Sequence, residues 1–148
     1  MDLRPATHED LPTLLKFEQG VVEEERPFNA AIKAASVVYY DLPDLISNPR
    51  SLLLIAEHNG DAAGCGYVQL RESKAAFSHE LHGYLGFMYV LRDFRGQRLN
   101  KQIVDALLKW GRAQGVQDFY LDVYAENQAA IRAYEKAGFK PLMVEMKL

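Results

Sequence analysis

Hydrophobic and polar residues follow two different periods along the first third of the chain. Residues 2–6 alternate with the period of a strand, and residues 11–25 repeat apolar side chains at helical spacing. Thr7 and Asp10 precede that helix at the spacing of a capping box. Pro27 predicts its end, because a proline inside a helix removes a backbone hydrogen bond.

The middle of the chain predicts a further helix followed by strands. The helix is expected within residues 39–48, with Asp41 as its N-cap and Pro43 in its first turn. Three strands are expected, the first two joined by a tight Asn-Gly turn: 51–58, 62–71 and 81–91.

The last third alternates between helix and strand. Helices are expected over residues 97–115 and 127–138, and each ends at a glycine, which favours the left-handed C-cap. Strands are expected at 116–125, between the helices, and at 139–148, after them. This order of elements predicts a single α/β or α+β domain over residues 1–148, built on a mixed sheet.

Composition is typical of a soluble globular protein, since 49% of the residues are hydrophobic and 25% are charged. The single cysteine, Cys65, lies in an apolar run, so we expect a buried side chain in a reducing compartment. No apolar run approaches the length of a membrane span, and the first residues do not resemble a signal peptide. We therefore expect a cytoplasmic protein without a membrane partner.

Charge is distributed unevenly along the chain. The formal net charge of −3 argues against broad nucleic-acid binding. Residues 1–49 carry nine Asp and Glu against four Lys and Arg, whereas residues 92–112 carry six Lys and Arg against two Asp. The first part could hold a cation and the second an anion, although a solvated surface gives the same asymmetry.

The basic part contains FRGQRLNKQIV (94–104), in which an arginine and a glycine come directly before a helix. The first turn of a helix leaves N–H groups unpaired and carries partial positive charge, so it is the usual place for an anion. On these residues alone, a helix start with surface arginines is the competing interpretation.

Two segments together give the chain a family resemblance: VLRDFRGQRLNKQIVDALLKWGRAQG (90–115) and YLDVYAENQAAIRAYEKAGFK (120–140). A strand, Arg-Gly and a helix, followed by a strand, Asn and a helix with Tyr-Glu-Lys-x-Gly-Phe, resemble the GCN5-related N-acetyltransferases, the GNAT superfamily. The order of elements extends this resemblance over essentially the whole chain. It implies the acyl-CoA N-acyltransferase fold, a mostly antiparallel central sheet flanked by helices.

The resemblance implies that the anion is the pyrophosphate of acetyl-CoA. The family motif is Arg or Gln, two residues, Gly, one residue, then Gly or Ala, and its backbone amides hold the phosphates. Arg95 matches the first position, but Arg98 and Asn100 replace the two small residues. A glycine is not needed at Arg98 if the local backbone is already helical. The residues expected to bind the phosphates are Arg95, Gly96, Gln97, Arg98, Leu99, Asn100 and Lys101.

By the same resemblance, the strand before this loop binds the pantetheine arm through its main chain, at Met88, Tyr89 and Val90, and supplies a backbone donor to the oxyanion. Tyr134 matches the general acid that protonates the departing sulfur of CoA, and Asn127 matches a residue that contacts CoA. A packed tyrosine and a helix N-cap are the alternative structural roles.

The general base is not identified by sequence. Many relatives carry an acidic residue in the strand before the phosphate loop, but here that stretch reads GYLGFMYV (83–90). Glu80 and His82, near its start, are weak candidates that would act through water. The HELH stretch (79–82) suggests a metal at first sight. However, His79 and His82 point to opposite faces on a strand and no third ligand follows, so we expect no metal.

Acidic and aromatic side chains near the end of the first long helix are candidates for binding the acceptor, because they can hold an ammonium ion. The candidates are Glu24, Arg26 and Phe28 in EEERPF (23–28), with Tyr39 and Tyr40 in YYD (39–41). A solvated run of charges is the alternative.

These features predict an N-acetyltransferase that moves an acetyl group from acetyl-CoA directly to an amine of a small molecule or a peptide. A non-catalytic acyl-CoA-binding or sensing domain on the same fold is the alternative, favoured by the altered glycines and the missing carboxylate. A dinucleotide-binding domain is disfavoured, because no glycine-rich turn follows the first strand. The sequence leaves a homodimer open.

Overall fold

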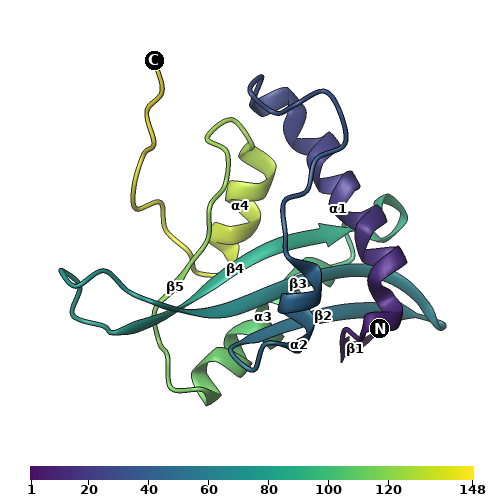
Figure 1. Ribbon diagram of the computed structural model, residues 1–148, viewed down its shortest axis with the longest axis horizontal. Coiled ribbons are helices and arrows are strands. Elements are labelled where there is room, and N and C mark those ends of the chain that lie inside the picture. The colour runs from purple at the N-terminus through teal and green to yellow at the C-terminus, as the bar shows by residue number, and fades with distance from the viewer.

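A five-stranded sheet forms the centre of the computed structural model, which describes residues 1–148 (Figure 1). In spatial order its strands are β1 (Asp2–Pro5), β2 (Ser51–His58), β3 (Asp61–Glu72), β4 (Leu81–Val90) and β5 (Phe119–Tyr120). Neighbours from β1 to β4 are antiparallel, whereas β4 and β5 are parallel. The predicted mixed, mostly antiparallel sheet flanked by helices is confirmed.

Helices cover both faces of the sheet, with α1 and α2 in front of it and α3 behind it in Figure 1. The α-helices are α1 (Leu11–Glu25), α2 (Leu42–Ser47), α3 (Leu99–Ala113) and α4 (Gln128–Lys136). Three short 3-10 turns are η1 (His8–Asp10), η2 (Arg26–Phe28) and η3 (Arg92–Phe94). None of these helices combines the length and the apolar character needed to cross a bilayer.

The core consists of two apolar layers, one on each face of the sheet, because successive strand residues point to opposite sides. On β2, Leu53 and Ile55 contact the layer under α1 and α2, while Leu54 and Ala56 contact the layer under α3. Buried residues of α1 and α3 recur at helical spacing, as predicted: Leu14, Phe17, Val21 and Val22 in α1, and Leu99, Ile103, Val104, Leu107 and Leu108 in α3.

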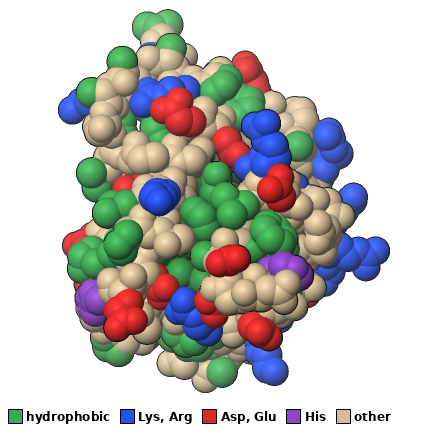
Figure 2. Space-filling model, turned by 90° about the vertical axis from the view of Figure 1, so that its right-hand side faces the viewer, with side chains coloured by type: hydrophobic (Ala, Val, Ile, Leu, Met, Phe, Trp, Pro, Cys, Tyr) green, Lys and Arg blue, Asp and Glu red, His purple; other side chains and the backbone are tan.

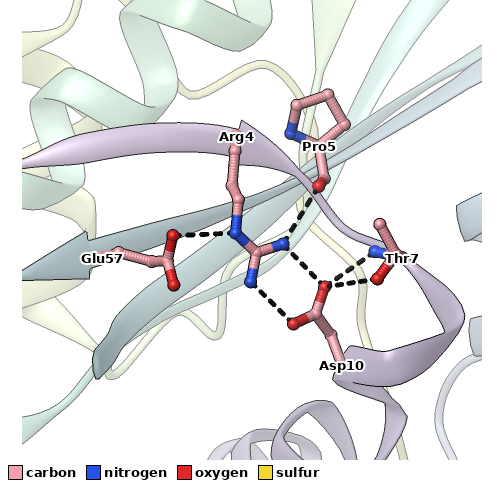
Figure 3. Close-up of polar contacts among 5 residues, drawn as sticks. All are labelled: Arg4, Pro5, Thr7, Asp10 and Glu57. Atoms are coloured by element: carbon pink, nitrogen blue, oxygen red, sulfur yellow. Dashed lines mark hydrogen bonds and ion pairs between the residues drawn. The ribbon is translucent and has the colours of Figure 1, made fainter. Parts of the chain in front are cut away.

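A polar cluster fixes the connection from β1 to α1 (Figure 3). Arg4 donates two hydrogen bonds to the carboxylate of Asp10, both 2.8 Å, and a third to Glu57 on β2, also 2.8 Å. Asp10 in turn accepts from the backbone N–H of Thr7 at 2.7 Å, which is the acidic half of the predicted capping box. The Arg4 hydrogen bonds are the largest cause that lowers the pKa of Asp10, to about 2.

Turn and cap residues occupy the predicted places. Asn59 and Gly60, with φ of 52° and 84°, form the tight turn between β2 and β3. Asp41 accepts from the backbone N–H of Asp44 at 3.2 Å and caps α2. The glycines after α3 and α4 have φ of 96° and 102°, as left-handed C-caps require.

The predicted strands at the end of the chain are largely wrong. Only Phe119 and Tyr120 of residues 116–125 form a strand, and residues 139–148 form none. The last segment alternates apolar and polar side chains, but it pairs with no other strand, and its large side chains Leu142, Val144 and Met146 are 77%, 75% and 86% exposed. Alternation gives strand propensity, whereas a strand requires a partner, which this segment does not have in the fold.

Candidate functional site

Strand β4 is paired on one side only over most of its length. It pairs with β3 throughout, but β5 pairs only with Gly83 and Tyr84. Residues 85–90 therefore present open backbone groups on the β5 side, of which the carbonyl of Val90 accepts from Arg95 Nε at 2.9 Å. An extended molecule can pair with such an edge in the manner of an added strand.

A β-bulge lies within this open part of β4. Phe87 has a φ of 53°, and Phe87 and Met88 lie opposite the single residue Gly66 on β3, where the register shifts. A Cβ on Gly66 would lie 2.5 Å from Met88 Sδ and 2.9 Å from Ile103 Cγ2, so a larger residue there would require these side chains to move. The bulge redirects the backbone of residues 87–90, and this segment includes Met88, Tyr89 and Val90, which were predicted to bind the pantetheine arm.

The loop between β4 and α3 is rich in unpaired backbone donors. The N–H groups of Gly96, Gln97 and Arg98 donate to no backbone carbonyl, and the α3 ladder begins only with the 3.1 Å bond from Gln102 N to Arg98 O. The first N–H groups of α3, from Leu99 onward, are therefore free as well. Consecutive unpaired donors at the positive end of a helix are features of the kind that bind phosphate.

Arg98 has a left-handed backbone, with φ of 63° and ψ of 16°. The helical backbone that would have made a glycine unnecessary here is not present, because the α-helix begins one residue later. Glycine adopts this conformation without strain, which explains why the family motif has a glycine at this position. Arg98 has a Cβ and is strained there. Asn100, in contrast, lies inside α3, where a side chain is ordinary.

Cationic side chains surround the loop, and two of them are already paired with carboxylates. Arg95 forms an ion pair with Glu24 at the end of α1, and Lys101 pairs with Asp105 at 2.6 Å. Arg98 is exposed and forms no ion pair. On the face shown in Figure 2, Lys and Arg side chains gather toward the right-hand edge and hydrophobic side chains cross the middle.

Helix α4 carries the two residues matched to the second family motif. Asn127 is its N-cap and accepts from the backbone N–H of Ala130 at 3.2 Å. Tyr134 packs against Phe139 with ring centroids 6.1 Å apart, and its hydroxyl has no hydrogen bond. Burial, followed by the charge of Glu25, raises the pKa of Tyr134 to about 12. The hydroxyl is therefore protonated at neutral pH, as a general acid must be.

Glu25, at the end of α1, is not among the residues predicted as a base. Its carboxyl is half-buried, and this burial, followed by the charge of Glu24, raises its pKa, against the effect of a hydrogen bond from Tyr39. Its charge also contributes to the raised pKa of Tyr134. In the sequence, helical spacing could have indicated that Glu25 is partly buried, because it lies on the same face of α1 as the buried Val21 and Val22.

The predicted acceptor residues lie around the end of α1. Glu24 is bound to Arg95, and Arg26 pairs with Glu23 at 2.8 Å. The rings of Phe28 and Tyr124 are stacked with centroids 6.1 Å apart, which connects η2 to the segment after β5.

Tyr39 and Tyr40 follow in the long segment before α2. Tyr39 contacts Glu25, whereas the ring of Tyr40 stacks on Phe87 of β4 at 4.5 Å. The structure therefore places these residues between α1 and the bulge of β4.

The two weak base candidates lie at the other end of β4. His82 lies six positions before Met88, which is about 20 Å along an extended strand. Burial and the neighbouring His79 lower the pKa of His82. Glu80 is exposed in the preceding loop. The structure does not bring either group to the open edge of β4.

The prediction that His79 and His82 point to opposite faces is wrong. His79 lies in the loop before β4, and both rings bond through Nδ1 to Ser73 Oγ, at 2.7 Å and 2.8 Å. His79 Nε2 also bonds to Tyr120 Oη at 2.9 Å. No three His, Cys, Asp or Glu side chains in residues 1–148 are grouped to hold a metal ion.

Comparisons with known proteins identify the family. The model of the acetyltransferase (GNAT) family matches residues 17–139. The chain therefore belongs to this family, and the resemblance drawn from the two segments is confirmed. A 61-residue segment is 33% identical to the uncharacterized N-acetyltransferase YobR of Bacillus subtilis, and covers 41% of this chain but only 25% of that relative.

Solved structures show the same fold over the full length. The chain matches a mutant of the BH1408 protein of Bacillus halodurans with a TM-score of 0.88 and 19% identity, covering 100% of this chain and 98% of that one. It also matches a predicted acetyltransferase with acetyl-CoA from Clostridium acetobutylicum, with a TM-score of 0.78, 16% identity and coverage of 99% and 94%.

Proposed function

We propose that this chain transfers an acetyl group from acetyl-CoA directly to an amine acceptor, which is a small molecule or a peptide. The observation that carries the proposal is the continuity of two sets of unpaired backbone groups. The open edge of β4, residues 85–90, leads through η3 into the loop whose N–H groups lack backbone partners. An extended pantetheine arm followed by a pyrophosphate needs these two features in this order.

The residues present fit acetyl-CoA. Backbone N–H groups from Gly96 to Lys101 would hold the pyrophosphate, with charge from Arg95, Arg98 and Lys101. The pairs Arg95–Glu24 and Lys101–Asp105 involve exposed side chains, and such pairs are worth about 1 kcal/mol or less. A phosphate can therefore displace them, and this would release Glu24 beside the acceptor site. Acetyl-CoA bound to a solved relative of the same fold supports this assignment.

Glu25 and Tyr134 are the proton acceptor and the proton donor in the proposed reaction. Glu25 takes the proton of the acceptor ammonium, which frees the nitrogen lone pair to attack the thioester carbonyl. A backbone N–H on the open edge of β4 stabilises the oxyanion. Tyr134 then gives its proton to the departing sulfur of CoA. The nitrogen of the collapsing intermediate still carries one proton more than the amide product, and the loss of that proton restores the Tyr134 hydroxyl. The raised pKa of Glu25 makes it a better base near neutral pH than an ordinary carboxylate.

A non-catalytic acyl-CoA-binding or sensing domain is the second candidate. It is favoured by the strained Arg98 at the glycine position and by the absence of a carboxylate from residues 83–90. The two candidates differ in turnover and not in acetyl-CoA binding.

The test combines calorimetric titration of acetyl-CoA with an assay of thiol release over a panel of amines. Binding together with thiol release from one class of amines would support the transferase, and loss of release in Tyr134→Phe would assign the acid. Tyr120→Phe is the matched control, because the Tyr120 hydroxyl bonds to His79, at the far end of β4. Binding without release for every amine would favour the sensing domain, and no binding would exclude both. A homodimer and a cytoplasmic location stay predictions.

A further inference from the structure

The tight turn between β2 and β3 carries the only Asn-Gly pair of the chain. Asn59 and Gly60 are both exposed at its tip, with φ of 52° and 84°. The N–H of Gly60 donates to no backbone carbonyl, and a Cβ placed on Gly60 would meet no atom within 4 Å. The backbone nitrogen after Asn59 is therefore unpaired and open, with no side chain of its own to shield it.

His58 lies beside the side-chain amide of Asn59. Its Nε2 is 3.2 Å from Asn59 Nδ2. The His58 ring packs against Phe94 of η3 with ring centroids 5.4 Å apart, which holds it at this place. An imidazole can give a proton to a leaving group near neutral pH. A backbone nitrogen, an amide carbon and a proton donor are thus adjacent, as an intramolecular reaction requires.

The other asparagines of the chain lack this combination. Asn48 precedes Pro49, whose nitrogen carries no hydrogen. Asn29 donates a 2.9 Å hydrogen bond from its side-chain nitrogen, and Asn127 accepts one of 3.2 Å at its side-chain oxygen. Asn100 lies in the first turn of α3, where the backbone is helical. Only the turn between β2 and β3 places a free backbone nitrogen and a proton donor beside an asparagine.

We propose that Asn59 is a modification site, at which the chain converts its own side-chain amide to a carboxylate with His58 as the proton donor. The Gly60 nitrogen forms a bond to Asn59 Cγ and releases its proton to water. Protonated His58 gives a proton to Asn59 Nδ2, the Cγ–Nδ2 bond breaks and ammonia leaves. A succinimide ring remains, and His58 regains its proton from the solvent.

Water is the only other reactant. It adds to either carbonyl carbon of the ring and opens it, which gives aspartate or, where the backbone then continues through the side-chain carbonyl, isoaspartate. No group is oxidised or reduced. Either product adds one negative charge to a chain of formal net charge −3. The new charge lies next to His58, which contacts Phe94 of η3.

The experiment is incubation of the protein at pH 7 without acetyl-CoA, followed by peptide mass spectrometry at successive times. Conversion raises the mass of a peptide by one dalton, and fragmentation distinguishes aspartate from isoaspartate. We expect Asn59 to convert at least about tenfold faster than Asn29, because a glycine follows it and a proton donor lies beside it. This comparison is made within the parent protein, so it does not depend on the folding of a variant.

Two histidine variants test the proton donor. His58→Phe keeps a ring against Phe94 and removes the nitrogen beside the amide, so the conversion of Asn59 should slow at least about threefold. His8→Phe, at an exposed histidine in η1, removes the same group away from the turn and should leave the rate unchanged. Both histidines are exposed, so neither substitution leaves a cavity in the core.

Three outcomes would overturn the proposal. Conversion of Asn59 no faster than that of Asn29 would show that the turn is not a modification site. An unchanged rate in His58→Phe would remove the role of His58, and so would an equal decrease of the rate in His8→Phe. Because the measurement needs neither acetyl-CoA nor turnover, its result is separate from that of the proposed acetyl transfer.

Discussion

Replacing Arg98 by glycine and by alanine separates backbone strain from charge in the phosphate loop. Arg98 has φ of 63° and ψ of 16°, where a Cβ lies too close to the following carbonyl oxygen. Both variants remove the same guanidinium group. Only glycine also removes the Cβ, so the difference between the two variants reports on the backbone alone.

The magnitude follows from two opposing effects. Relief of the left-handed strain favours the glycine variant by about 1–2 kcal/mol. The greater freedom of glycine in the unfolded chain costs about 0.5–1 kcal/mol. We therefore expect Arg98→Gly to be more stable than Arg98→Ala by about 0.5–1 kcal/mol. The alanine variant itself should lie within about 0.5 kcal/mol of the parent protein, because the exposed Arg98 forms no ion pair.

Urea denaturation of the three proteins measures this difference. The midpoint should be highest for Arg98→Gly, with equal m-values, since the surface exposed on unfolding is the same. If the alanine variant were as stable as the glycine variant, Arg98 would not have the left-handed conformation and the reasoning would fail.

Acetyl-CoA binding by Arg98→Gly and Arg98→Ala tests the role of the arginine independently of protein stability. If Arg98 contributes charge to the phosphates, both variants should bind acetyl-CoA roughly fivefold more weakly, which corresponds to about 1 kcal/mol for an exposed charge pair. The dependence of the affinity on salt should also decrease equally in both. Tighter binding by the glycine variant would instead mean that the arginine obstructs the loop.

The remaining predictions concern catalysis and stability. Tyr134→Phe should lower turnover in the thiol-release assay by about 100-fold or more and leave the acetyl-CoA Kd within about twofold, whereas unchanged turnover would remove the acid role. The kcat/KM of the parent protein should fall as the pH drops through the pKa of Glu25, which lies above its ordinary value of 4.5. In Glu25→Gln this decrease of kcat/KM at acidic pH should be absent. The lowered pKa of Asp10, about 2 against 3.8, gives stability that is complete above pH 3.8 and is lost as the pH falls toward 2. Arg4→Met should therefore lower the free energy of unfolding at pH 7 by about 1–2 kcal/mol. It should also make this free energy less dependent on pH as the pH falls from 3.8 toward 2, and urea denaturation at several pH values measures both effects.

Local chemistry in the sequence determined most of the elements of this protein. The first long helix and the strand at 51–58 were predicted to the residue, and the Asn59-Gly60 turn and the Asp41 cap were also correct. The helix and the strand depend on the period of apolar residues, and the turn and the cap depend on residues that are adjacent in the chain. Both kinds of information can be read from the sequence alone. The family motif predicted phosphate binding at residues 95–101, and of these Leu99, Asn100 and Lys101 form the first turn of α3.

Tertiary structure decided the features that need contacts between distant residues. The last segment alternates like a strand, but pairing requires a neighbour, which residues 139–148 do not have. The raised pKa of Glu25 depends on its burial, and the pairing of Arg95 with Glu24 joins residues 71 positions apart. The left-handed backbone of Arg98 is imposed where β4, η3 and α3 are connected. Burial, pairing and backbone conformation at such places are properties of the folded chain, because the groups that set them are brought together only by folding.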